Sequence, residues 1–205
     1  MIPRPPRGVR ARGGPRREAV GSAGVSPAPR PTPESLLITG TVGAGKTTVA
    51  HVVGDLLADA GTPTAVVDLD ALCRSRPAPE GDPFNVELLL RNLRCVAGNH
   101  IAAGAVRLVL AGVAESRGDR ERYREAVGTG LTVCRLRVHL PTVRRRLVRR
   151  HENDHAPDAL RWHLDRAGEL DRILDRAHVA DHTVDATDGS AADIATAVLR
   201  AVGWG

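Results

Sequence analysis

Gly40-Thr41-Val42-Gly43-Ala44-Gly45-Lys46-Thr47 is the stretch that decides the fold of this 205-residue chain. It matches the pattern G-x-x-x-x-G-K-[ST], and Thr48 follows it directly. Glycines at these spacings let consecutive backbone N–H groups point inward around a phosphate, and a helix that starts behind them adds its dipole. The sequence therefore predicts a nucleotide-binding phosphate loop over residues 40–48.

Lys46 is the only lysine among the 29 lysines and arginines of the chain. A compact ammonium on a slim stem can lie along a tight loop and reach the β- and γ-phosphates, whereas the broad guanidinium of arginine is a poor substitute. We therefore expect Lys46 to bind the phosphates and to act in catalysis. We expect the hydroxyl of Thr47 to ligate Mg²⁺.

The segments around the loop have the periodicities that this mechanism requires. An apolar run over residues 36–39 predicts a buried strand before the loop. Apolar residues at helical spacing follow the loop, and Gly61 and Pro63 end them. Similar alternation continues to the end of the chain, with strands predicted at 64–67, 108–113, 133–140 and 179–184 and long helices at 85–103, 158–177 and 191–202.

This alternation predicts an α/β fold with a five-stranded parallel sheet and helices on both faces. In such sheets ligands bind at the carboxyl ends of the strands. The second strand leads into Asp68-Leu69-Asp70, so we expect the carboxylates of Asp68 and Asp70 on one face of its end. Glu115 follows the third strand at the same edge.

Several segments resemble the small-molecule branch of the P-loop kinases, which includes adenylylsulfate kinase, gluconate kinase, shikimate kinase and nucleoside monophosphate kinases. The resemblance spans about residues 35–204. Besides the phosphate loop, it rests on Asp68-Leu69-Asp70, Ser116-Arg117-Gly118-Asp119-Arg120, Val138-His139-Leu140 with the arginine-rich residues 144–150, and Val184-Asp185-Ala186-Thr187.

The resemblance implies the three-layer sandwich of P-loop NTPases, with strand order 2-3-1-4-5. It implies a kinase that uses ATP and Mg²⁺ and transfers the γ-phosphoryl group to a small-molecule acceptor. Asp68 or Asp70 would accept the proton of the acceptor or hold Mg²⁺ through water, or one of the pair simply caps a loop. Glu115 is either a further metal-linked carboxylate, like that of a Walker B strand, or an ordinary loop residue.

Arginines would neutralise the migrating phosphoryl group in such a kinase. The candidates are Arg149 in an arginine-rich lid and Arg117 and Arg120 after the third strand. Adenylylsulfate kinases carry Lys-Gly-Leu-Tyr after the fourth strand, whereas this chain has His-Glu-Asn-Asp-His-Ala-Pro over residues 151–157. The resemblance therefore leaves the acceptor open.

The composition divides the chain into two parts. Residues 1–34 hold eight of the fourteen prolines, and their seven arginines and two glutamates give a net charge of +5, equal to that of the whole chain. We predict a disordered tail over 1–34 and a kinase-like domain over 35–205, with a lid over about 141–177. The excess basicity lies in the tail, and only four aromatic residues are present, so we expect no specific nucleic-acid partner.

Other features exclude further classes of protein. Three widely spaced cysteines predict no disulfide framework and suit a reducing cytoplasm, and no apolar run is long enough to predict a membrane span. The sequence leaves the oligomeric state open.

Residues 151–155 match the zinc-protease pattern H-E-x-x-H, but polar residues fill the motif and Pro157 follows it, so we interpret them as a lid loop. The competing hypothesis is an ATPase or a nucleotide-sensing regulatory protein without a small-molecule acceptor.

Overall fold

The computed structural model of the chain describes residues 31–152 and 157–205. Within these ranges one parallel sheet has its strands in the order β2-β3-β1-β4-β5. The strands are β1 (Glu34–Gly40), β2 (Thr64–Asp68), β3 (Arg107–Ala111), β4 (Gly130–Arg137) and β5 (His182–Asp185). The predicted parallel sheet and its predicted strand order are confirmed.

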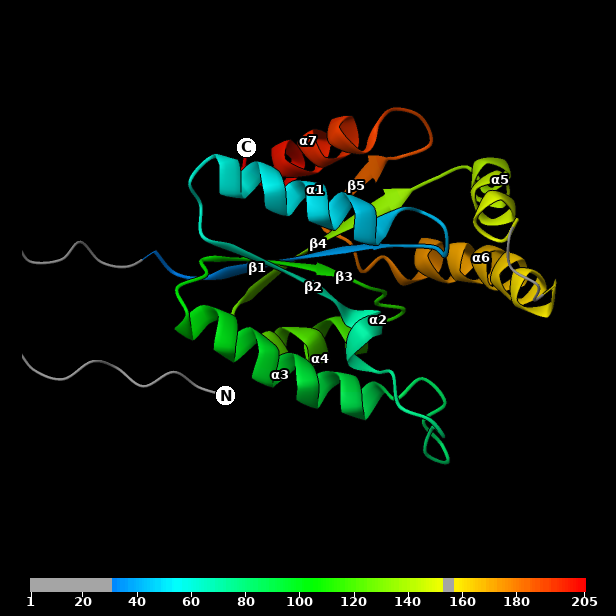
Figure 1. Ribbon diagram of the computed structural model, residues 1–205, viewed down its shortest axis with the longest axis horizontal. Helices are drawn as coiled ribbons and strands as arrows, with labels where there is room; N and C mark the ends of the chain where they lie inside the picture. The colour runs from blue at the N-terminus through cyan, green and yellow to red at the C-terminus, as the bar shows by residue number, and fades with distance from the viewer. Residues whose placement is uncertain (1–30, 153–156) are drawn as a thin grey trace, which may run out of the picture. The chain divides into compact units, whose positions relative to one another are not determined.

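Helices cover both faces of this sheet (Figure 1). On one face α1 (Lys46–Asp59) packs against α7 (Ala191–Val202), and on the other face α3 (Val86–Ala102) packs against α4 (Arg117–Val127). The helices α5 (Leu140–Arg150) and α6 (Pro157–Ala177) occupy the predicted lid segment and lie beyond the carboxyl ends of the strands. The sheet and its two helical layers form the expected three-layer sandwich.

Alternation of side chains along β1 explains why the sheet has a core on each face. Leu36 and Ile38 belong to the core that α1 and α7 cover, whereas Leu37 belongs to the core on the side of α3 and α4. All three side chains are fully buried. Complete burial of a leucine or isoleucine contributes about 1.5–3 kcal/mol, so this strand anchors the phosphate loop that follows it.

The end of β2 differs from the prediction. β2 ends at Asp68, and a short helix, α2 (Leu69–Leu72), begins immediately after it. The side chain of Asp68 caps this helix by accepting a 3.0 Å hydrogen bond from the backbone N–H of Asp70. The prediction that Asp68 and Asp70 share one strand face is therefore wrong, because the cap turns the chain before Asp70.

Three other strands have boundaries that differ from those predicted. β4 begins and ends three residues earlier than predicted. It ends earlier because Leu140 already belongs to α5 and Pro141 lies in the first turn of that helix. β3 and β5 are shorter than predicted. Apolar residues beside them, such as Val113 and Val179, pack against the core without extending the strand ladder.

The predicted tail is mostly outside the described residues, which begin at residue 31. Glu34, the last residue assigned to the tail, is instead the first residue of β1, and its carboxylate is 3.0 Å from the guanidinium of Arg107 on β3. No helix in the described part of the chain has both the length and the apolar character needed to cross a membrane.

The H-E-x-x-H segment does not begin within a helix. His151 is the C-terminal cap of α5, Glu152 follows it in a turn, and His155 lies outside the described residues. Nε2 of His151 is 3.1 Å from Nδ1 of His163 on α6, so this pair links the two lid helices.

Candidate active site

The phosphate loop connects β1 to α1 in a conformation that depends on its glycines. Gly43 and Gly45 have φ values of 78° and 93°, in the left-handed region that glycine adopts without strain. At Gly40 an added Cβ would lie 2.7 Å from the carbonyl oxygen of Leu136 on β4, so a larger residue cannot fit there. The loop delivers the chain to the N-terminus of α1, where backbone N–H groups and the helix dipole favour an anion.

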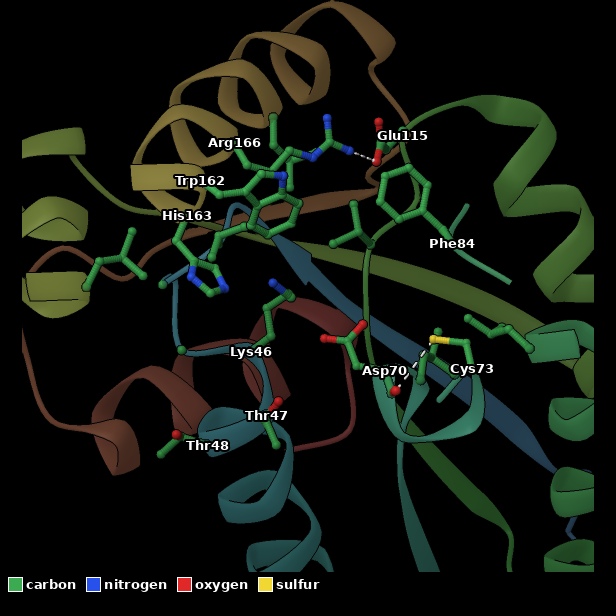
Figure 2. Close-up of a pocket in the computed structure, with 18 of the residues that line it drawn as sticks. Lys46, Thr47, Thr48, Asp70, Cys73, Phe84, Glu115, Trp162, His163 and Arg166 are labelled. Carbon is green, nitrogen blue, oxygen red and sulfur yellow. Dashed lines mark hydrogen bonds and ion pairs between the residues drawn. The ribbon is translucent and has the colours of Figure 1, made fainter. Parts of the chain in front are cut away.

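Lys46 is the first residue of α1, and its ammonium folds back over the loop. Nζ donates a 3.1 Å hydrogen bond to the carbonyl oxygen of Thr41. Burial lowers the pKa of Lys46, and the negative charges of Asp70 and Asp68 oppose this shift. Figure 2 shows Nζ directed into the open space above the loop, the position expected for a lysine that contacts phosphate.

Thr47 and Asp68 form an oxygen-rich pair beside the loop. The hydroxyl of Thr47 donates a 3.2 Å hydrogen bond to Oδ2 of Asp68, whose other carboxylate oxygen caps α2. Mg²⁺ prefers oxygen ligands and usually binds through one or two protein groups together with nucleotide phosphates and water. Thr47 and Asp68 therefore fit a Mg²⁺ ion that is delivered with a nucleotide. Residues 31–152 and 157–205 contain no group of three His, Cys, Asp or Glu side chains that could hold a metal alone.

A cleft of about 700 Å³ opens over the phosphate loop. Its walls come from the loop and the start of α1, from α2, from α3 and the segment before it, from α4 and the segment before it, and from α5 and α6. The cleft is lined by Val42, Gly43, Gly45, Lys46, Thr47, Thr48, Leu69, Asp70, Cys73, Phe84, Val86, Leu89, Val113, Glu115, Asp119, Tyr123, Arg146, Leu147, Arg150, Trp162, His163, Arg166 and Leu170.

The arginines of α5 that line the cleft are Arg146 and Arg150, whereas Arg149, the predicted one, is exposed and does not line it. The buried residues Val143 and Leu147 define the inward side of α5. At 100° per residue, Arg150 lies close to that direction and Arg149 on the opposite side. Val143 and Leu147 thus set which arginines of α5 line the cleft, and this apolar pair is visible in the sequence.

Arg146 joins α5 to the phosphate loop and to the segment after β5. Its guanidinium donates hydrogen bonds to the carbonyl oxygens of Ala44 in the phosphate loop, at 3.4 Å, and of Ala186 after β5, at 3.0 Å. Leu147 packs against Gly43, where an added Cβ would lie 3.1 Å from its Cγ. The N-terminal lid helix therefore rests directly on the phosphate loop.

The two arginines predicted after β3 lie elsewhere. Arg117 is exposed and does not line the cleft. Arg120 donates to the carbonyl oxygen of Val179 at 3.0 Å and to the carboxylate of Asp181 at 2.9 Å, and that carboxylate also accepts from the backbone N–H of Val133. The structure therefore places Arg120 in a link between α4, β4 and the segment before β5.

Glu115 lies on the far wall of the cleft rather than beside Thr47 and Asp68. Its carboxylate forms an ion pair with Arg166 of α6, which also contacts Glu169 at 2.8 Å (Figure 2). The guanidinium of Arg166 lies 5.9 Å from the ring centroid of Phe84. In the structure Glu115 is therefore paired with an arginine, and its metal-linked role stays a prediction.

Aromatic residues of the site were missed by sequence reasoning. Phe84, Tyr123 and Trp162 all line the cleft, and together they are three of the four aromatic residues in the whole chain. The hydroxyl of Tyr123 donates a 3.0 Å hydrogen bond to the carbonyl oxygen of Val113, and burial raises its pKa. These residues come from three separated segments, so no local motif connects them.

Comparison with known proteins agrees with this geometry. The sequence profile of the adenylylsulphate kinase family matches residues 32–152. No protein with a curated description matches the sequence.

The fold matches solved kinases that are 21–22% identical to this chain, a level that shows the fold alone. A gluconokinase from Sinorhizobium meliloti 1021 has a TM-score of 0.56 with 22% identity, over 85% of this chain and 94% of its own. An APS kinase from Mycobacterium tuberculosis, in complex with AMPPNP and APS, has a TM-score of 0.55 with 22% identity, over 84% and 99%. A shikimate kinase from Acinetobacter baumannii, in complex with shikimate, has a TM-score of 0.54 with 21% identity, over 83% and 93%.

The family profile covers more than half of the chain, and its region includes the phosphate loop, α2 and the first lid helix. The chain belongs to the adenylylsulphate kinase family, within the clan of P-loop small-molecule kinases.

Proposed function

We propose that this protein transfers the γ-phosphoryl group of Mg-ATP to a hydroxyl group of a small-molecule acceptor. The observation that carries the proposal is that one cleft of about 700 Å³ joins the phosphate loop to a second wall with its own polar and aromatic side chains. A site that only hydrolyses ATP needs no such second wall. The APS kinase of similar fold is in complex with both AMPPNP and APS, which supports the proposal that this cleft binds a nucleotide and an acceptor together.

The nucleotide half supplies positive charge to the phosphates. Lys46 lies over the loop, and Arg150 is close enough to lower the pKa of Lys46 further. Arg146 binds backbone carbonyls of the phosphate loop and of the segment after β5. Phosphoryl transfer depends on alignment and charge neutralisation more than on covalent help from the protein. Mg²⁺, held by Thr47 and Asp68 and by the phosphates, would neutralise part of the charge that develops on the β- and γ-phosphate oxygens.

Asp70 is the residue best placed to act on the acceptor. It lines the cleft next to Lys46, and its carboxylate points towards the ammonium (Figure 2). The acceptor oxygen forms a bond to the γ-phosphorus while the bond to the β,γ-bridging oxygen breaks, and ADP leaves with that electron pair. The hydroxyl proton passes to Asp70, whereas Asp68 stays engaged with Thr47 and the cap of α2.

A cytoplasmic location fits this proposal. Cys73, Cys95 and Cys134 are all free thiols, as is usual in a reducing compartment. ATP is also available there as the phosphoryl donor.

The test is ADP formation from Mg-ATP by the full-length chain, with and without pooled sugars, sugar acids, nucleoside monophosphates, adenylylsulfate and antibiotic alcohols. We expect one pool to raise turnover at least about tenfold, and Lys46→Ala to abolish that turnover. Slow hydrolysis that depends on Lys46 and ignores every pool would overturn the kinase proposal and favour an ATPase or a nucleotide sensor.

A further inference from the structure

The two halves of the cleft carry opposite charge. Three of the described lining residues, Lys46, Arg146 and Arg150, give the nucleotide half a formal charge of +3, which matches a triphosphate. The other half, here called the acceptor wall, consists of Asp70, Phe84, Glu115, Asp119, Trp162 and Arg166. Its three carboxylates and one guanidinium give a formal charge of −2.

The one arginine of the acceptor wall is already neutralised. Arg166 forms ion pairs with Glu115 and Glu169, and only 16% of its side chain is exposed. Its guanidinium also lies near the ring of Phe84. An anionic ligand that bound Arg166 would compete with Glu115 and leave that carboxylate without its partner, which opposes binding.

The three carboxylates of the acceptor wall all lie within electrostatic reach of Tyr123. Asp119 is fixed because Oδ2 accepts hydrogen bonds from the backbone N–H groups of Glu115 and Ser116, both at 3.0 Å. The negative charges of Asp119, Asp70 and Glu115 all act on Tyr123, where they add to burial in raising its pKa. A second anion brought to this wall would meet the same repulsion.

The same wall exposes aromatic surface. Phe84 and Trp162 are 58% and 53% exposed, more than any other large apolar side chain in the described residues. They come from the segment before α3 and from α6, and Figure 2 shows both directed into the cleft near Arg166. Exposed rings in a concave site bind flat apolar or aromatic groups by stacking and by loss of apolar surface from water.

We propose that the acceptor is a hydroxyl compound that carries an aromatic or flat apolar ring and no anionic group. This inference rests on the proposed kinase function and specifies its second substrate. It separates this chain from a kinase for adenylylsulfate, whose phosphosulfate group is anionic. Phe84 and Trp162 would hold the ring, and the Glu115–Arg166 pair would reject anions.

The first experiment compares ring alcohols that differ only in charge. The full-length chain is saturated with Mg-AMPPNP, so that ring compounds cannot use the nucleotide half, and binding is measured by ligand-observed NMR. The compounds form a neutral, a cationic and an anionic pool that contain the same rings. One such set is 3-phenylpropane-1,2-diol, its amine analogue phenylalaninol and its carboxylate analogue phenyllactate. We expect neutral or cationic members to bind at least about tenfold more tightly than their anionic twins.

Equal or preferential binding of the anionic pool would overturn the proposal, and so would the absence of binding by every pool to protein that still binds AMPPNP. Bound alcohols are then tested for ADP formation. Binding without ADP formation would contradict the kinase function and leave the charge preference standing. ADP formation that only anionic acceptors stimulate would support a kinase and refute this inference.

The second experiment tests the named side chains. Trp162→Ala and Phe84→Ala remove exposed rings that contribute little to the core, so the fold and AMPPNP affinity are expected to persist while ring alcohols bind about fivefold to tenfold more weakly. Val148→Ala is the matched control, because Val148 is 47% exposed and does not line the cleft. Glu115→Gln removes one of the two carboxylates that pair with Arg166, the other being Glu169. The variant should shift the neutral-to-anionic preference about tenfold towards anions, and an unchanged preference would contradict the role of the Glu115–Arg166 pair.

Discussion

The hydroxyl of Thr41 in the phosphate loop donates a 2.6 Å hydrogen bond to the backbone carbonyl of Ala167 in α6, and both residues are buried. The two residues are 126 positions apart in the sequence. Since α6 also carries Trp162 and Arg166, this bond connects the phosphate loop to the acceptor wall. The two halves of the cleft are therefore joined by a specific polar contact as well as by packing.

Removing this hydroxyl should destabilise the protein. Thr41→Val keeps the branched shape and leaves the Ala167 carbonyl without its buried donor, so we expect a loss of about 1–3 kcal/mol in the free energy of unfolding. In a domain of this size the melting temperature falls by several degrees, which calorimetry would detect. Thr41→Ser retains the donor and serves as the control. Equal melting temperatures for the valine variant and the wild type would contradict the assigned bond.

Asp68 and Asp70 should respond differently to amidation. Asp68→Asn keeps a good helix cap but weakens the acceptor for Thr47, so the Mg²⁺ concentration for half-maximal activity should rise about tenfold. Asp70→Asn removes the proposed base and should lower kcat about 100-fold with little change in the Mg²⁺ requirement. Measuring activity against Mg²⁺ concentration for both variants gives kcat and the Mg²⁺ requirement of each, and so tests the two roles. If the two effects are exchanged, the roles assigned here are exchanged as well.

The fold was predictable because its signals are local and repeated. The phosphate loop, the apolar strand before it and the alternation of elements are each read from neighbouring residues, and strand order followed from the resemblance to P-loop kinases. The turn at Asp68 was missed because a side-chain cap competed with a continuing strand pattern.

The cleft was less predictable, because its walls are assembled from distant segments. Phe84, Tyr123 and Trp162 share no motif, and only the topology brings them together. The place of Glu115 after β3 leaves it open as a metal-linked carboxylate or a loop residue, and it gives no sign that Arg166 from α6 pairs with this carboxylate. A partner 51 residues away leaves no local trace in the sequence.

The arginines of α5 allow a direct comparison between those that line the cleft and Arg149, the one predicted from the sequence. Arg146 and Arg150 line the cleft, so Arg146→Ala and Arg150→Ala should each lower kcat/KM about tenfold to 100-fold through lost charge at the phosphates. Arg149→Ala should stay within about twofold of the wild type, because its side chain is exposed on the other side of the helix. Steady-state kinetics with one acceptor measures kcat/KM for the three variants and the wild type. A loss at Arg149 equal to that at Arg150 would support the catalytic role of Arg149 that the sequence predicts.

The three thiols should react with iodoacetamide in the order of their accessibility and acidity. Cys95 is exposed and should react first. Cys73 lines the cleft, and burial together with the nearby charge of Asp70 raises its pKa, so its reaction should be slower and should accelerate as the pH rises. Burial raises the pKa of Cys134 to about 12, so this thiol should react only after unfolding.

Peptide mass spectrometry of time points at pH 8 measures the three rates separately. Saturating Mg-AMPPNP with a bound ring alcohol should slow the reaction of Cys73, which faces the cleft, and leave the rate of Cys95 unchanged as the internal control. Cys95→Ser removes the fastest reaction and makes the slower one easier to follow. Protection of Cys95 rather than Cys73 would place the ligands on a different surface of the molecule and would contradict the cleft as the site of binding.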